Sequence, residues 1–201
     1  MTFIRPYPSP LHPFCTKVRV YIVSRAPAPL HSNLILPFTA KILNIPIYTT
    51  TQNAARLGST VSELKELLPE SHSTEIDKTA FSMLVPELTS LLTSQSSNSS
   101  PVSAIIVGIE THICVTQTAL DLLALGHKVY VLADGVSSCN AGERVIALAR
   151  LRSEGAVVTT SESFLYEVLG DAKNENFKAI AGLVRETKES TREAVETFCR
   201  L

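Results

Sequence analysis

The stretch that decides the fold is GIETHICVTQTALDLLALGHKVYVLAD, residues 108–134. It overlaps the almost entirely apolar run SAIIVGI, residues 103–109, which is typical of a central strand in a parallel sheet. Residues 111–125 then follow a helical pattern that ends at Gly126, and KVYVLAD, residues 128–134, returns to a strand pattern. This order predicts a βαβ unit, whose two strands run parallel.

The same alternation of strands and helices extends on both sides of this unit. Strand-like and helical segments lie at 17–23, 33–43, 45–51, 142–155, 156–160 and 161–170. We therefore expect an α/β protein with three layers, α/β/α, in which a mostly parallel, doubly wound sheet is covered on both faces. We expect a single domain over 1–201, with an irregular lead-in at 1–16 and a helical tail at 177–201.

Charge and cysteine content restrict the class of protein. The net charge of -1 gives no bulk attraction to nucleic acid or to an anionic membrane, and neither partner is expected. No apolar run reaches the length of about 20 residues that a membrane span needs. The four cysteines form no CxxC pair, which favours reduced thiols in the cytoplasm. They are Cys15, Cys114, Cys139 and Cys199.

The N-terminal part of the chain has an unusual charge pattern. It contains no Asp or Glu from residue 1 to residue 58, although Arg and Lys are present. A basic, acid-free beginning is compatible with a mitochondrial transit peptide. The preferred interpretation is a tail that precedes the first strand, and a third is a segment that is atypical for this fold.

The carboxyl ends of parallel strands are where ligands bind in such sheets. This rule selects Ser24, Thr51, Glu110 and Asp134 as rim positions. Cys114 follows the central strand, and with Thr111 as the N-cap it lies in the first turn of the next helix. Free N–H groups and the helix dipole there favour a thiolate, and we expect them to lower the pKa of the cysteine. The alternative is a small apolar residue buried in the core.

The motif around Cys114 resembles the isochorismatase-like cysteine hydrolases. The residues that carry the resemblance are GIETHICVTQTALDLLALGHKVYVLADGVSS, together with DKTAFSM at 77–83 and ALARLRSEGAVVTTSESFLYEVLGDA at 147–172. The likeness extends from about 33 to 177 and is strongest to the small isochorismatase-domain proteins, whose substrates are generally unassigned. It implies a three-layer fold and hydrolysis of an amide or related C–N bond of a small molecule. Hydrolysis of isochorismate itself does not need a thiol, so the presence of the cysteine favours the amidase-like branch of the family.

The resemblance also implies roles for individual residues. Cys114 would be the nucleophile and Lys78 would support the charges, since an ammonium near a thiol stabilises the thiolate. A cis peptide bond is implied between Ile109 and Glu110, and the backbone N–H groups of Glu110 and Cys114 would form the oxyanion hole. Phe81 would line the substrate pocket.

One element of the family pattern is missing. The family has an Asp at the end of its first strand, where this chain has VRVYIVSRAPAP at 18–29. The closest position is Ser24, a far weaker base, and neither Asp77 nor Asp134 is a confident replacement. We therefore expect severely reduced hydrolysis, because a general base contributes about 10²–10⁴-fold in rate. The alternative is an inactive family member that serves as a binding or scaffolding subunit.

No cofactor or metal is expected. The nicotinamidase branch of the family carries an Asp-x-His pair, whereas this chain has His31 and His72 without one, and its histidines show no metal-binding spacing. His112 is interpreted as a helix-surface residue, and the Glu110 side chain has no assigned role. The expected partners are a small-molecule substrate and further copies of the chain in a homo-oligomer.

Overall fold

The computed structural model describes residues 18–23, 31–68, 71, 73–94 and 101–199. The predicted lead-in at 1–16, the rim position Ser24 and Cys15 therefore lie outside the described residues. In the described part of the chain, none of the helices has the length and apolar composition needed to cross a membrane.

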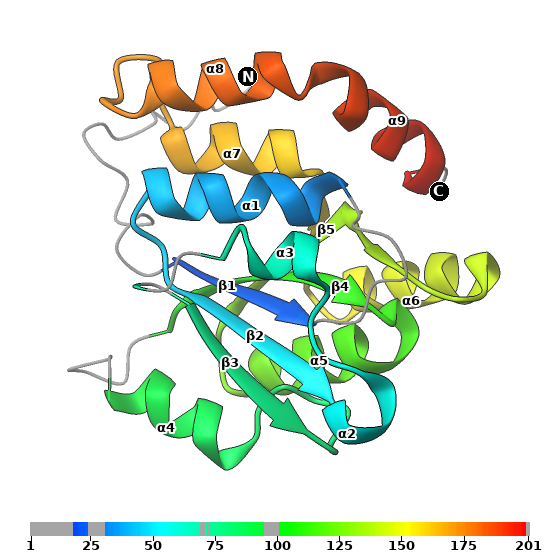
Figure 1. Ribbon diagram of the computed structural model, residues 1–201. Helices are drawn as coiled ribbons and strands as arrows, with labels where there is room; N and C mark the ends of the chain where they lie inside the picture. The colour runs from blue at the N-terminus through cyan, green and yellow to red at the C-terminus, as the bar shows by residue number, and fades with distance from the viewer. Residues whose placement is uncertain (1–17, 24–30, 69–70, 72, 95–100, 200–201) are drawn as a thin grey trace, which may run out of the picture.

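Six strands form one sheet in the order β3-β2-β1-β4-β5-β6, and every pairing between neighbours is parallel. The strands are β1 Val18–Val23, β2 Ile47–Gln52, β3 Ser73–Lys78, β4 Ser103–Ile109, β5 Lys128–Ser137 and β6 Val157–Thr159. This confirms the predicted parallel, doubly wound sheet (Figure 1). The strand order reverses between β1 and β4, and such a switch point is where open α/β sheets bind ligands.

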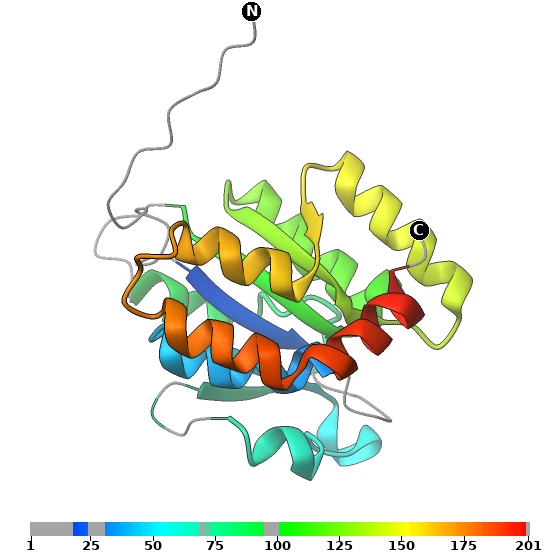
Figure 2. The ribbon, with the colours of Figure 1, turned by 90° about the horizontal axis from the view of Figure 1, so that it is seen from above.

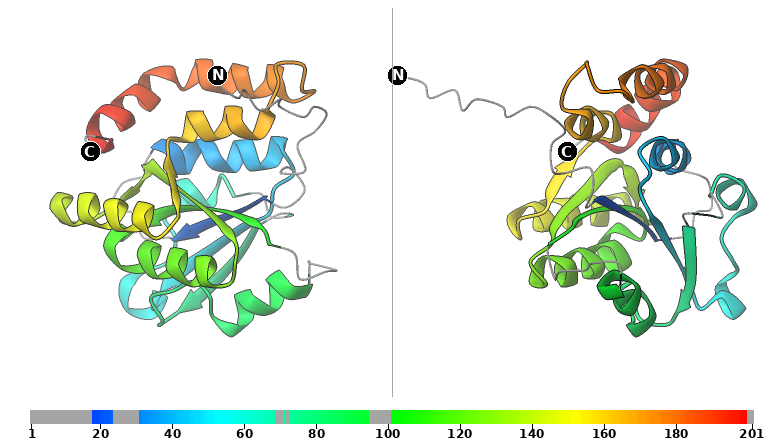
Figure 3. Two further views of the ribbon diagram at one scale, coloured as in Figure 1. Left: turned by 180° about the vertical axis from the view of Figure 1, so that it is seen from behind. Right: turned by 90° about the vertical axis from the view of Figure 1, so that its left-hand side faces the viewer.

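Helices cover both faces of the sheet, which confirms the three-layer arrangement (Figures 1 and 3). In these views α1, α7, α8 and α9 lie over one face, and α4, α5 and α6 lie over the other. The helices are α1 His31–Ile42, α2 Ala54–Leu57, α3 Ser62–Lys65, α4 Pro86–Ser94, α5 Thr116–Ala124, α6 Ala141–Ser153, α7 Ser161–Leu169, α8 Phe177–Glu186 and α9 Lys188–Phe198. Each face has its own apolar cluster, and the second of these includes Cys114.

The C-terminal tail predicted at 177–201 consists of α8 and α9, which pack on this chain as an outer layer above α1 and α7 (Figure 2). Ile180 of α8 is fully buried in the apolar cluster that α1 and α7 share, and Phe177, Leu183 and Val184 pack against the same cluster. The continuation α9 contacts α1 and β5. The tail thus adds a layer to one face of the sheet.

Two strands differ from the sequence expectation. Residues 73–78, for which no strand was predicted from the sequence, form the edge strand β3 in register with β2. The strand β5 continues to Ser137, beyond the predicted end at Asp134, because its register with β4 shifts between Ile106 and Gly108. The first difference places Lys78 at the carboxyl edge of the sheet. The second lets β5 end beside β4, with Ser137 paired to Ile109.

Candidate active site

The turn that carries Cys114 follows β4 directly. A cis peptide bond joins Ile109 and Glu110, which confirms that prediction. The helix then starts with the wide π-helical turn Thr111–Val115, in which the Val115 N–H donates to the Glu110 carbonyl at 3.2 Å. The cap is therefore Glu110, and the expectation that Thr111 caps the helix is wrong. The insertion of a wider turn moves the start of α5 to Thr116.

Cys114 is buried, with 7% of its surface exposed, in the apolar cluster beneath α4, α5 and α6. Burial raises the pKa of the Cys114 thiol, and this effect exceeds the lowering of the pKa by the Lys78 charge and by the backbone N–H groups of Glu110 and Cys114. The sequence expectation of a lowered pKa is therefore wrong in its net direction. Burial therefore destabilises the thiolate more than the Lys78 charge and the backbone N–H groups of the turn stabilise it.

Lys78 ends β3 and is almost completely buried. Its ammonium donates to three oxygens, the Gln52 Oε1 at 2.6 Å and the carbonyl groups of Ala80 at 2.8 Å and Phe81 at 3.1 Å. Burial lowers the pKa of Lys78, while the nearby Cys114 and Asp77 raise it. The three acceptors match the three N–H groups of an ammonium, so this pocket holds a positive charge in a defined orientation.

Gln52 connects the two candidate catalytic side chains. It ends β2, directly beside Lys78 in the sheet register. Its Oε1 accepts from the Lys78 ammonium and also from the Cys114 thiol, with 4.0 Å between oxygen and sulfur. Its Nε2 donates to the Thr79 carbonyl at 2.7 Å, which fixes the direction of the amide. Gln52 was not predicted from the sequence, although it follows the rim position Thr51 by one residue.

Thr118 ties the cysteine turn to the segment that follows Lys78. Its hydroxyl donates to the Cys114 carbonyl at 2.7 Å and accepts from the Met83 N–H at 2.9 Å. The side chain is fully buried. A single hydroxyl thus links α5 to the loop whose carbonyl groups hold the lysine.

The two other aspartates considered as bases lie elsewhere. Asp77 points to the opposite face of β3, where it accepts from the Thr51 hydroxyl at 2.7 Å and the Ala54 N–H at 2.9 Å. Asp134 is fully buried and accepts from the N–H and the hydroxyl of Ser161. Neither accepts a hydrogen bond from Cys114 or Lys78. Among the described residues, no carboxylate accepts one from either group.

Phe81 belongs to the loop that follows Lys78, and 51% of its surface is exposed. Its carbonyl group takes part in the site through Lys78, while the aromatic ring remains accessible. The structure therefore brings together Cys114, Lys78, the Glu110 backbone and the Phe81 carbonyl among the predicted residues.

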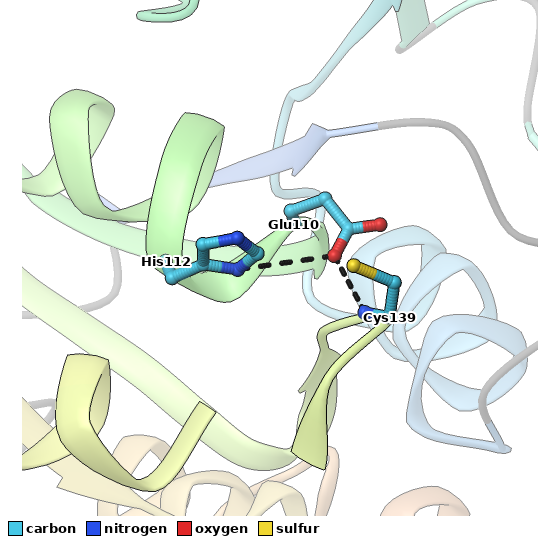
Figure 4. Close-up of side chains that lie close together, drawn as sticks. All are labelled: Glu110, His112 and Cys139. Atoms are coloured by element: carbon cyan, nitrogen blue, oxygen red, sulfur yellow. Dashed lines mark hydrogen bonds and ion pairs between the residues drawn. The ribbon is translucent and has the colours of Figure 1, made fainter. Parts of the chain in front are cut away.

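A second group of polar side chains lies next to this turn (Figure 4). The Glu110 carboxylate lies between the His112 ring and Cys139, and its Oε2 accepts from the Cys139 N–H at 2.7 Å. The distance from the same oxygen to the His112 Nδ1 is 3.9 Å, and that nitrogen is 3.0 Å from the Ser138 hydroxyl. No role was predicted for the Glu110 side chain, and its contact with Cys139 joins residues that are 29 positions apart in the sequence.

The fold and the position of the site define a parallel α/β protein with a cysteine and a lysine at the carboxyl edge of its sheet. The family model described as the isochorismatase domain matches residues 36–163. The secreted isochorismatase effector Isc1 of Phytophthora sojae is 43% identical over 161 residues, which cover 80% of this chain and 76% of that protein. The chain belongs to the isochorismatase family of hydrolases.

Solved structures agree with this assignment. The structure of MAR1 ribonuclease from Caenorhabditis elegans has a TM-score of 0.76 and 33% sequence identity, and the match covers 85% of this chain and 90% of that one. The YcaC gene product of Escherichia coli, described as an octameric hydrolase of unknown specificity, has a TM-score of 0.75 with 22% identity over 97% and 98% of the two chains. At that identity the likeness to YcaC concerns the fold alone.

Proposed function

We propose that this chain is a cysteine hydrolase for an amide or related C–N bond of a small molecule, with Cys114 as the nucleophile. The observation that carries the proposal is the grouping of Cys114 and Lys78 around the amide oxygen of Gln52, which is 4.0 Å from the sulfur and 2.6 Å from the ammonium nitrogen. The group lies at the carboxyl edge of the sheet, next to the switch point between β1 and β4.

In this proposal the Cys114 sulfur attacks the carbonyl carbon of the substrate and forms a C–S bond. The negative oxygen that develops accepts from the backbone N–H groups of Glu110 and Cys114, and the Lys78 ammonium stabilises negative charge at the sulfur and at the substrate. Cleavage of the C–N bond releases the amine, which takes up the thiol proton, and leaves a thioester. Water then hydrolyses the thioester and restores the thiol, while Phe81 lines the substrate pocket.

The proton of Cys114 is the weak point of this mechanism, and we propose that turnover is impaired for this reason. A carboxamide oxygen accepts a hydrogen bond, but it is not basic enough to hold a proton at neutral pH. Burial also raises the pKa of the thiol, so little thiolate forms without a base. A missing general base typically costs about 10²–10⁴-fold in rate.

The second candidate is a catalytically inactive family member that binds or scaffolds other molecules. It is favoured by the same observation, that the group hydrogen-bonded to both Lys78 and Cys114 is an amide. The buried ammonium argues against it, because an unused buried charge is costly to retain.

The test uses acrylamide, which is both a small amide and a thiol electrophile, at neutral pH with mass spectrometry of each cysteine. If the proposal is right, modification of Cys114 saturates with acrylamide concentration, because binding precedes reaction. The exposed Cys139 serves as an internal control, whose modification should stay proportional to concentration. The variant Lys78→Gln should slow modification of Cys114 by about tenfold or more, because it removes the charge that stabilises the thiolate.

The inactive family member is favoured instead by a different outcome. Cys114 would then be modified no faster than Cys199, without saturation, and at the same rate in Lys78→Gln as in the parent protein.

A panel of small amides then provides the substrate, with Cys114→Ser as the control for each activity. An RNA substrate forms a separate arm, because the structurally similar Caenorhabditis elegans protein is called a ribonuclease. Cleavage of RNA that survives in Cys114→Ser would point away from the thiol mechanism.

The proposal includes a homo-oligomer in the cytoplasm, with mitochondria as the alternative location, and no nucleic-acid or membrane partner. The oligomer rests on the family resemblance. Light scattering of the purified full chain gives its mass directly, and a monomer at micromolar concentration would contradict this part of the proposal.

A further inference from the structure

We propose that Glu110, His112 and Cys139 form a binding site for a transition-metal cation of the zinc type. Each residue offers one ligand atom, and these atoms all lie within 4.8 Å of one another. Glu110 and His112 come from the turn that follows β4, and Cys139 follows the end of β5. Because β4 and β5 are neighbours, the parallel sheet delivers both segments to the same edge.

The donor set has the chemistry of a zinc site. A carboxylate oxygen, an imidazole nitrogen and a thiolate sulfur are the three ligand types that bind Zn²⁺ in proteins, whereas Ca²⁺ and Mg²⁺ take oxygen ligands. Three protein ligands leave a fourth position of the tetrahedron free for water or another small ligand. A carboxylate and a thiolate would also give the site two negative charges, which a divalent cation neutralises.

The geometry needs only a small adjustment to close around an ion. With bond lengths of about 2.0–2.3 Å, ligand atoms in a tetrahedral site stand about 3.3–3.8 Å apart. The Glu110 Oε2 and the His112 Nδ1 are already 3.9 Å apart. The third residue is fixed beside them, because its N–H donates to Glu110 at 2.7 Å. Rotation of the exposed Cys139 side chain is therefore the main movement required.

The cluster is partly shielded from solvent by its surroundings. The side chains of His112 and Glu110 are 22% and 27% exposed. In the absence of an ion, the hydrogen bonds from the Ser138 region and the Cys139 N–H hold the ring and the carboxylate in place. The site is distinct from the Lys78–Gln52–Cys114 group, and the inference does not depend on the proposed hydrolase function.

Titration of the full chain with Co²⁺, followed by absorption spectroscopy, tests the proposal, because a thiolate bound to Co²⁺ gives a charge-transfer band in the near ultraviolet. The parent protein should show this band, and the variant Cys139→Ser should lose it. The matched control Cys199→Ser removes a different thiol and should keep it. Competition by Zn²⁺ should abolish the band with tighter apparent binding than Co²⁺.

The other two ligands are tested separately. The variants Glu110→Gln and His112→Gln should each weaken Co²⁺ binding by at least about tenfold, since even residues that only support a ligand contribute 10–100-fold. The variant Ser138→Ala should bind Co²⁺ at least as well as the parent, because it removes a competing hydrogen bond to the His112 nitrogen. A band that persists in Cys139→Ser, or binding that both Gln variants leave unchanged, would overturn the proposal, as would absence of any band.

Discussion

Gln52 occupies a position between two ionisable side chains, yet its own side chain carries no charge. Its oxygen accepts from both the Lys78 ammonium and the Cys114 thiol. A carboxylate in the same place could accept the thiol proton, and the adjacent ammonium would keep that carboxylate ionised between turnovers. The identity of this one side chain therefore decides whether the site contains a base.

The variant Gln52→Glu tests this reasoning, because it replaces an amide by a carboxylate of nearly the same shape. We expect hydrolysis of a small amide substrate to rise by about tenfold or more, within the 10²–10⁴-fold that a general base contributes. The measurement is kcat/KM for the best amide of a panel. The double variant Gln52→Glu with Cys114→Ser must lose the gain. Unchanged turnover in a folded Gln52→Glu protein would show that this position does not limit the reaction.

The sequence could predict Cys114 and Lys78, because both stand in motifs whose residue types already carry the chemistry. It could not predict the partner of the thiol. Gln52 becomes a neighbour of Lys78 only through the register of β2 and β3, and β3 itself was not recognised as a full strand. The net pKa direction of Cys114 was also out of reach, because it depends on how deeply the packed helices bury the sulfur.

At the scale of elements, the alternation of side chains along β3 separates two adjacent charged residues. Lys78 faces the cysteine, while Asp77 faces the start of α2 and accepts from Thr51 and Ala54. These hydrogen bonds lower the pKa of Asp77 below its usual value. A lowered pKa in the folded state stabilises the protein above the unfolded pKa, and this stabilisation disappears as the pH falls through the folded value.

The variant Asp77→Asn should therefore flatten the acid dependence of stability. We expect its free energy of unfolding, measured with urea at pH 7 and at pH 3, to fall less on acidification than that of the parent protein. The variant Asp121→Asn, on α5, controls for the loss of one negative charge. An equal acid-induced loss in Asp77→Asn and in the parent would mean that these hydrogen bonds do not depend on the charge of Asp77.

A second prediction at this scale concerns the link between α5 and the loop that follows Lys78. The variant Thr118→Val removes the hydroxyl that bridges the Cys114 carbonyl and the Met83 N–H. Leaving a buried N–H unsatisfied should destabilise the protein by about 1–3 kcal/mol in urea unfolding. Hydrogen exchange at the Met83 amide should accelerate in this variant, whereas Thr118→Ser should keep it protected. Protection that persists in Thr118→Val would contradict the assigned bridge.

At the scale of the whole molecule, the pattern of apolar runs and helical segments was sufficient to predict the layers, since parallel strands buried on both faces are almost entirely apolar. The edge strand β3 has the sequence STEIDK, whose polar residues hide the strand pattern. The N-cap of α7 also depends on a contact between residues far apart in the sequence. Thr160 accepts from the Ser163 N–H, because Ser161 is engaged by the distant Asp134. Such long-range pairings have no local sequence signal.

The outer layer of α8 and α9 decides whether the chain unfolds as a single domain, as we propose. Ile180 of α8 is fully buried against the cluster of α1 and α7, so Ile180→Ala should cost about 2–5 kcal/mol. Because the tail shares its core with the sheet, urea unfolding should keep one transition with a lower midpoint, seen alike by circular dichroism and tyrosine fluorescence. The control Ile146→Ala, at a position that is 68% exposed, should leave the midpoint nearly unchanged. A separate early transition in Ile180→Ala would instead make the tail an independent unit docked on the sheet.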